Sequence, residues 1–357
     1  MNSQACIYIQ AARKTPTRIN PENPMDAKAP VHQAVTPQSR GGLLKLLPNN
    51  IGGPLIGLAL LVLVFSFSSE FFFTLRNGLN ILDQVTVLGI LAIGMTAVIV
   101  IGGIDLSVGS VLAFSMMMLG WLYQDQGMTL GLAIPVAIAT GMLAGLVSGL
   151  LITYARLPAF IATLTMMSVA RGLANILTEG RQIVGYPEWF TNLATVRHFG
   201  FLSATVGLFL IMLVLAWVFL RFRAGGRNLY AIGGSPEVAR LSGIKVRAIT
   251  LWVYAISGAL AGIAAVTMAA RLDSSQPSAG LTLELDAIAA VVIGGASLSG
   301  GVGSVGGTLV GVLIIGVLRN GLNLLGVSPF IQQVVIGVVI ALAVTIDTLR
   351  RRSNSAH

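Results

Sequence analysis

The 357-residue chain has few of the residues on which metal sites and soluble enzymes depend. It contains one cysteine, Cys6, and three widely separated histidines, His32, His198 and His357. A single thiol excludes an intrachain disulfide and a thiolate metal cluster. Neither an H-E-x-x-H motif nor the G-x-x-x-x-G-K-[ST] loop that holds nucleotide phosphates is present. We therefore expect no enzymatic activity, no metal and no cofactor bound by this chain itself.

Charge is equally scarce. Only 10% of the residues are charged and 55% are hydrophobic, and the mean hydropathy is +0.85. A soluble domain has roughly 25% charged residues. The isoelectric point near 10.3 is compatible with nucleic-acid binding, but the basic residues lie at the ends of apolar runs, where they orient a membrane protein. We expect the lipid bilayer as the surrounding medium and no nucleic-acid partner.

Apolar runs long enough to cross a bilayer recur along the chain and predict an all-α, polytopic transmembrane helical bundle with about ten spans. The expected spans are 51–69, 79–101, 108–122, 130–153, 158–177, 204–220, 248–270, 285–297, 302–318 and 330–348. We expect a disordered tail at 1–50, a transmembrane domain at 51–349 and a basic tail at 350–357. The boundary between the eighth and ninth spans is open.

The distribution of lysine and arginine predicts the orientation. With a cytoplasmic N-terminus, the inside segments hold sixteen of these residues and the outside segments five, among them Arg271 and Arg319. Cytoplasmic segments carry the excess of basic residues. We therefore expect both termini to lie on the cytoplasmic side of the membrane.

The glycine-rich stretch 283–311 contains Gly294, Gly295, Gly300 and Gly301. Glycine costs about 1 kcal/mol relative to alanine in a helix interior, but small residues let membrane helices approach closely. We expect broken or closely packed helices around a polar passage. Residues 101–110, IGGIDLSVGS, resemble 293–299, IGGASLS; an internal repeat and a coincidence of composition are both open explanations.

Polar side chains within the spans are candidates for the passage, because such residues face the bundle or a wet cavity. The candidates are Gln84, Arg171, Asn175, Asn320 and Asn323. Amides can exchange hydrogen bonds with a hydroxyl-rich solute, but they also bridge helices. We expect Arg171 and Asn175, one turn apart, to form the best single patch.

Asp105 has a different expected role. Gly102 and Gly103 precede it and Ser107 follows it, a composition typical of a turn that is stabilised by local side-chain hydrogen bonds. We therefore expect Asp105 and Ser107 to fix the turn that follows the second span.

The segment 221–247 carries the signals of a short helix outside the membrane. Ser235 can cap its N-terminus, with Pro236 at the first position, Glu237 in the first turn and Gly243 just after its end. Such a helix suits docking into a groove on another protein. The alternative is a surface helix that lies on lipid headgroups.

A family resemblance favours docking. Glu237-x-Ala239-x-x-x-Gly243 resembles the Glu-Ala-Ala…Gly loop through which ABC importer permeases contact their ATPase, although Val238 replaces the first alanine and the Ile-x-Leu-Pro continuation is missing. The residues assigned to this coupling loop are Gly233, Gly234, Ser235, Glu237, Ala239, Arg240 and Gly243. Four motifs in order resemble the ribose-type sugar permeases of the ribose/branched-chain amino acid permease group, across roughly residues 54–347: GGIDLSVGS, YAIGGSPEVARLSGI, LDAIAAVVIGGASLSGG and NGLNLLGV.

The resemblance implies a binding-protein-dependent importer of the bacterial inner membrane. A periplasmic protein would deliver a simple sugar to two permease subunits, either identical copies or paralogues. A cytoplasmic ATPase pair would bind ATP and magnesium. The alternative is an ion-coupled secondary transporter, which would usually show carboxylate pairs or a carboxylate–histidine relay deep in the spans.

Overall fold

The structure is a computed structural model that describes residues 52–198 and 200–354; the predicted disordered tail at 1–50 and the last residues of the basic tail lie outside the described residues. The described part is predominantly helical, which confirms the all-α prediction. Its helices are α1 (Gly52–Ser68), α2 (Leu75–Val100), α3 (Val108–Gln124), α4 (Leu130–Thr153), α5 (Ala159–Ile176), α6 (Glu188–Thr195), α7 (Ala204–Phe222), α8 (Ala224–Gly234), α9 (Pro236–Leu241), α10 (Val246–Leu272), α11 (Leu283–Ile293), α12 (Val305–Leu324) and α13 (Pro329–Asn354).

Six of these helices are long and apolar enough to cross a membrane: α2, α4, α5, α7, α10 and α12. Their burial differs widely. In the most apolar window of α2, 83% of the residues are buried, against 11% in α7. Because both helices are strongly apolar, this difference places α2 at the centre of the bundle and α7 on its outside, where its side chains face lipid.

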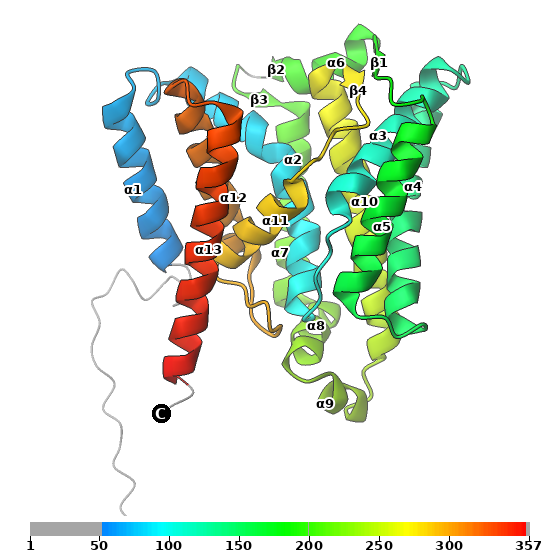
Figure 1. The fold of residues 1–357 in the computed structure, drawn as a ribbon, viewed down its shortest axis with the longest axis vertical. Helices are drawn as coiled ribbons and strands as arrows, with labels where there is room; N and C mark the ends of the chain where they lie inside the picture. Colours follow the sequence, from blue (N-terminus) through cyan, green and yellow to red (C-terminus); the bar gives the residue numbers. More distant parts are fainter. Residues whose placement is uncertain (1–51, 199, 355–357) are drawn as a thin grey trace, which may run out of the picture. The chain divides into compact units, whose positions relative to one another are not determined.

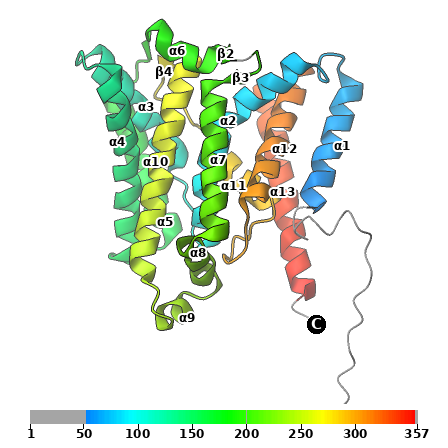
Figure 2. The same cartoon turned by 180° about the vertical axis from the view of Figure 1, so that it is seen from behind.

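The bundle has two distinct ends. Figure 1 shows α8 and α9 at one end, which is also where α1 begins and α13 ends, and α6 at the other. At the α6 end, two antiparallel pairs of two-residue strands join the loops: β1 (Ile183–Val184) pairs with β4 (Ser274–Ser275), and β2 (Arg197–His198) pairs with β3 (Leu202–Ser203). Figure 2 shows α7 and α10 from behind, both running to the α8–α9 end.

Two helices are preceded by non-helical backbone that runs inside the bundle. Residues 101–107 lead from α2 into α3, and residues 276–282 lead from β4 into α11. The helix α11 has only 11 residues, a rise of about 16 Å against a hydrocarbon core of about 30 Å. It is therefore too short to cross a membrane by itself, and the non-helical segment 276–282 precedes it inside the bundle.

This arrangement corrects the expected eighth and ninth spans. The helices begin and end elsewhere than 285–297 and 302–318, because residues 294–304 form an irregular connection between α11 and α12. Gly295, Gly300 and Gly301 have positive φ angles of 92°, 85° and 74° in this connection, a conformation that glycine adopts without steric cost. The non-helical segments that enter the bundle are 101–107 and 276–282, and not the connection 294–304. The similar stretches 101–110 and 293–299 both begin at the C-terminal end of a helix, α2 and α11 respectively.

Glycines allow the helices beside these breaks to touch backbone to backbone. A Cβ atom built on Gly294 would lie 2.3 Å from the Gly307 carbonyl oxygen, and one on Gly311 would lie 1.8 Å from that of Ala290. These contacts join α11 to α12. Between α4 and α10, a Cβ atom on Gly258 would lie 2.1 Å from the Gly141 carbonyl oxygen. Close packing through small residues, as expected from the sequence, holds the bundle together.

Candidate functional site

The two non-helical segments meet inside the bundle, where α3 and α11 begin. A Cβ atom on Gly109 would lie 2.3 Å from the carbonyl oxygen of Gly280 and 2.3 Å from Oε2 of Glu284. The first turns of the two helices therefore touch, and each directs its unpaired backbone N–H groups toward the meeting point. The Glu284 carboxylate lies in the first turn of α11, where the helix dipole favours a negative charge.

Arg171 on α5 holds one of these segments in place. Its Nη1 atom donates hydrogen bonds to the carbonyl oxygens of Pro277 and Ala279, the second at 2.8 Å. Irregular backbone at membrane depth needs such partners, because lipid offers none. Asn175, one turn further on, is exposed and donates to the Arg171 carbonyl oxygen at 2.8 Å. Arg171 and Asn175 therefore lie together beside the break, and Arg171 has a positioning role there.

Asp105 holds the other segment. Its side chain is buried, with 1% exposed. Oδ1 accepts hydrogen bonds from the Ser107 N–H at 3.0 Å and the Ser107 hydroxyl at 2.6 Å, and Oδ2 accepts one from the Ser257 hydroxyl of α10 at 2.9 Å. The carboxylate thus closes the turn before α3 and attaches it to α10. A buried charge is tolerated where it is hydrogen-bonded in this way.

A small cavity of about 140 Å³, mostly apolar but containing a few polar groups, lies between α2, α10, α11 and α12. Gln84 lines it together with the ion pair of Asp286 and Arg319. Asp286 is buried within α11 and Arg319 lies within α12. The expectation that Arg319 lies in an outside loop is therefore wrong, because Arg319 lies within α12. This pair cannot be recognised from the sequence, because its members are 33 positions apart on different helices.

The remaining pathway candidates bridge helices. Asn320 on α12 and Asn77 on α2 exchange two amide hydrogen bonds of 2.9 Å in a buried position. Asn323 accepts a hydrogen bond from Gln332 of α13 at 2.9 Å. Reciprocal amide contacts of this kind are common between membrane helices. They favour the helix-bridging alternative for Asn320 and Asn323.

The coupling loop forms the short helix that its capping residues predict. The Ser235 hydroxyl accepts a hydrogen bond from the Val238 N–H at 3.3 Å, α9 ends at Leu241, and Gly243 has a φ angle of 82°. The side chains of Val238 and Leu241 are 61% and 78% exposed. This helix therefore presents an apolar face to its surroundings at the α8–α9 end of the bundle (Figure 1).

Glycine contacts join the coupling loop to the membrane helices. A Cβ atom on Gly233 of α8 would lie 1.8 Å from the Val100 carbonyl oxygen at the end of α2 and 2.3 Å from the Gly301 nitrogen. The Gly301 N–H in turn donates to that Val100 oxygen at 2.9 Å. The hydroxyl of Tyr230 donates to the Gly303 carbonyl oxygen at 2.9 Å, and burial raises its pKa, so the phenol stays protonated. A movement of α8 therefore reaches both α2 and the α11–α12 connection.

Sequence reasoning missed several residues of this arrangement. Gly109, Gly280 and Glu284 meet only because of the fold, and Ser257 lies in a stretch of α10 that is mostly apolar. For Asp286 and Arg319 the sequence indicates only that each needs a partner, because an ionised residue in an apolar run requires one; it does not identify which residue that partner is. Within the described residues, no group of three His, Cys, Asp or Glu side chains could hold a metal ion.

Comparisons with known proteins agree with this architecture. Residues 77–344 match the family model described as "Branched-chain amino acid transport system / permease component". The chain is 47% identical over 305 residues to the ribose import permease RbsC of Bacillus subtilis, covering 83% of this chain and 92% of that protein. It is 44% identical over 304 residues to RbsC of Escherichia coli K12, covering 83% and 93%.

A more distant relative is the L-arabinose ABC transporter permease AraH of Azospirillum brasilense, 35% identical over 325 residues, which cover 90% of this chain and 94% of that protein. No solved structure matches. Matches of this extent to a permease family, together with the apolar helices, identify a multi-pass inner-membrane transport protein and not an enzyme. The chain belongs to the family of ABC transporter permease components that includes the ribose import permeases.

Proposed function

We propose that this chain carries a ribose-like pentose or a hexose across the inner membrane, delivered by a periplasmic sugar-binding protein and driven by a cytoplasmic ATPase that binds ATP and magnesium. The observation that carries the proposal is the 44–47% identity to ribose import permeases over most of both chains. A second permease subunit, identical or paralogous, completes the transporter. We propose ten membrane crossings, two of them made partly by residues 101–107 and 276–282.

The orientation follows from the charges of the segment between α7 and α10. Residues 221–247 contain six lysines and arginines and one acidic residue, Glu237. Basic residues of this density favour the cytoplasmic side. The α8–α9 end, with the start of α1 and the end of α13, therefore faces the cytoplasm. Reporter fusions at residue 230 and at the C-terminus should both report a cytoplasmic location, and a periplasmic signal from either would contradict this orientation.

The ATPase docks on α9. This helix is capped at both ends, has an apolar exposed face, and continues through α8 into contacts with α2 and the α11–α12 connection. An amphipathic helix is typically bound by a hydrophobic groove on its partner. Movement of the ATPase would then reach the non-helical segment 101–107, since this segment begins where α2 meets Gly233.

The sugar passes the polar groups beside the interrupted segments, where transporters of other families place their binding sites. Gln84, Arg171 and Asn175 retain this proposed role, and Asn320 and Asn323 contribute by holding α12 to its neighbours. Hydroxyl groups of a sugar can replace single hydrogen bonds at this surface without a tight site, which suits a conduit. Arg171→Ala should impair uptake while the subunit still assembles, because the carbonyl groups of Pro277 and Ala279 lose their donor. Normal uptake would remove Arg171 from the pathway.

The docking proposal is tested by co-purification of the ATPase with variants of the full-length chain. Val238→Asp should weaken the association strongly, because a carboxylate enters an apolar contact. Glu237→Ala, in the first turn of α9, and Gly243→Ala, just after its end, should also weaken it. The matched control is Val184→Asp at the α6 end, where Val184 is 58% exposed against 61% for Val238. Equal recovery of the ATPase by Val238→Asp and Val184→Asp would refute the docking role.

The sugar is tested separately. A panel of pentoses and hexoses is offered to membrane vesicles that contain the permease, the ATPase and the binding protein encoded with them. ATP-dependent uptake of ribose or a close relative supports the proposal. Uptake of branched-chain amino acids without any sugar uptake would contradict it and would leave the docking result unaffected.

A further inference from the structure

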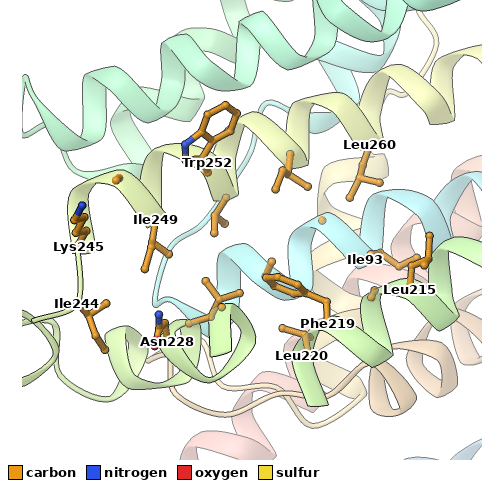
Figure 3. Close-up of a pocket in the computed structure, with 18 of the residues that line it drawn as sticks. Ile93, Leu215, Phe219, Leu220, Asn228, Ile244, Lys245, Ile249, Trp252 and Leu260 are labelled. Atoms are coloured by element: carbon orange, nitrogen blue, oxygen red, sulfur yellow. The ribbon is translucent and has the colours of Figure 1, made fainter. Parts of the chain in front are cut away.

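An apolar groove of about 760 Å³ opens on the outside of the bundle between α7 and α10, with α2 behind it and α8 at one end. Figure 3 shows Ile93, Leu215 and Leu260 at one end of the groove and Asn228, Ile244 and Lys245 at the other. The side chains of Leu215, Trp252 and Ile256 are more than half exposed, at 63%, 53% and 51%. The groove is therefore accessible from the lipid that surrounds α7.

The groove is polar at one end only. Its hydrophilic side chains are Asn228, Ser242 and Lys245, and all three lie where α8 and the start of α10 meet. The remainder is lined by aliphatic side chains, Phe219 and Trp252. From Lys245 to Ile256 the helix rises by about 16 Å, about half of the ~30 Å hydrocarbon core. The polar end thus lies at headgroup depth, and the apolar part follows one leaflet.

Charge distinguishes between the amphiphiles that could occupy the groove. Lys245 and Asn228 make no side-chain hydrogen bond or ion pair within the described part of the chain, and Lys245 is exposed. The nearby segment 221–247 carries six basic residues against one acidic residue. A basic pocket between helices at the cytoplasmic surface is suited to a phosphate headgroup of an anionic lipid. A zwitterionic lipid would gain less, because its own cation would face Lys245.

We propose that this groove is a binding site for an anionic phospholipid, with the phosphate at Lys245 and Asn228 and an acyl chain along Phe219, Ile249 and Ile256. The lipid enters from the leaflet on the α8–α9 side. Gly243 and Ile244, which connect α9 to α10, line the same groove. The bound headgroup therefore supports the connection through which the coupling helix is attached to the bundle.

The test uses the full-length chain in nanodiscs that contain phosphatidylglycerol with a photoreactive acyl chain, and a parallel set with photoreactive phosphatidylcholine. Phosphatidylglycerol should label peptides of α7 and α10 more strongly than phosphatidylcholine does. Native mass spectrometry then counts the phosphatidylglycerol retained after extraction. Lys245→Gln should lower this retention by about fivefold, the change expected for one basic residue near a lipid surface.

The matched control is Arg247→Gln, which removes a cation two positions away that does not line the groove. Its retention of phosphatidylglycerol should stay near that of the unmodified chain. Ala248→Trp, whose ring fills the polar end of the groove, should abolish α10 labelling in protein that elutes as a folded species. Equal losses for Lys245→Gln and Arg247→Gln, labelling that avoids α7 and α10, or cross-linking of a second copy into the groove would each overturn the proposal.

Discussion

Replacing Gly233 by alanine should disconnect the coupling helices from the membrane bundle. The new Cβ atom would lie 1.8 Å from the Val100 carbonyl oxygen and 2.3 Å from the Gly301 nitrogen. A carbon–oxygen contact is normally no shorter than about 3.3 Å, so α8 must move away by about 1.5 Å. In that movement the packing at Gly233 is lost and the 2.9 Å hydrogen bond from Gly301 to Val100 is strained.

The expected cost has two parts. Overpacking of a close-packed site costs about 1–3 kcal/mol, and a buried group left without its hydrogen bond costs about 1–3 kcal/mol. At roughly 2–4 °C per kcal/mol for domains of moderate size, the Tm of the detergent-solubilised permease should fall by several degrees. ATP hydrolysis by the bound ATPase should continue without sugar uptake, because α9 still docks but α8 no longer moves α2 in concert.

Gly234, the next residue on α8, provides the control. A Cβ atom on Gly234 would have no atom within 4 Å, so Gly234→Ala changes the same helix by the same methyl group without a clash. Its Tm and its ratio of uptake to ATP hydrolysis should match those of the unmodified chain. The reasoning is refuted if Gly233→Ala and Gly234→Ala give the same Tm and the same ratio of uptake to ATP hydrolysis.

Two further predictions concern buried groups. Arg319→Gln leaves the carboxylate of Asp286, which is 2% exposed, without its cation, and this costs about 3–5 kcal/mol. Size-exclusion profiles of this variant should show little folded protein. The double variant Asp286→Asn/Arg319→Gln should recover the folded protein. A double variant no better than the single one would contradict the pairing. Burial raises the pKa of Tyr186 to about 12, against about 10 when unfolded. The stabilisation from the buried neutral phenol is therefore complete below pH 10 and falls by about 2–3 kcal/mol as the pH rises toward 12. Tyr186→Phe should show a smaller loss of unfolding free energy over this pH range in alkaline unfolding. A loss equal to that of the unmodified chain would contradict this prediction.

Features that depend only on a few neighbouring residues, such as an apolar span or a capped helix, could be predicted from the sequence. The span at Leu130–Thr153 has the bounds that its apolar run predicts, because lipid requires a continuous helix of that length. The helix α9 begins at Pro236 and ends before Gly243 as its caps predict, since each cap acts within a few residues. The local contact of Asp105 with Ser107 has the same origin.

The non-helical segments inside the bundle could not be found in this way. Residues 276–282, QPSAGLT, have the composition of an exterior loop. They lie inside the bundle because Arg171, more than 100 positions earlier in the chain, binds their carbonyl groups, and because Gly109 leaves room for Gly280. Asn320 was a candidate for the pathway, but its partner Asn77 lies 243 positions away. Contacts of this range depend on tertiary structure, which local patterns do not specify.

The central claim is that this chain moves sugar only when an ATPase acts on it through α9. The most direct test reconstitutes the full-length permease in liposomes, alone and together with its ATPase and sugar-binding protein, and measures accumulation of radiolabelled ribose with ATP on the α8–α9 side. The account predicts uphill accumulation in the complete system, none without ATP, and none by the permease alone under an imposed proton or sodium gradient. Uphill accumulation by the permease alone under an ion gradient would contradict it.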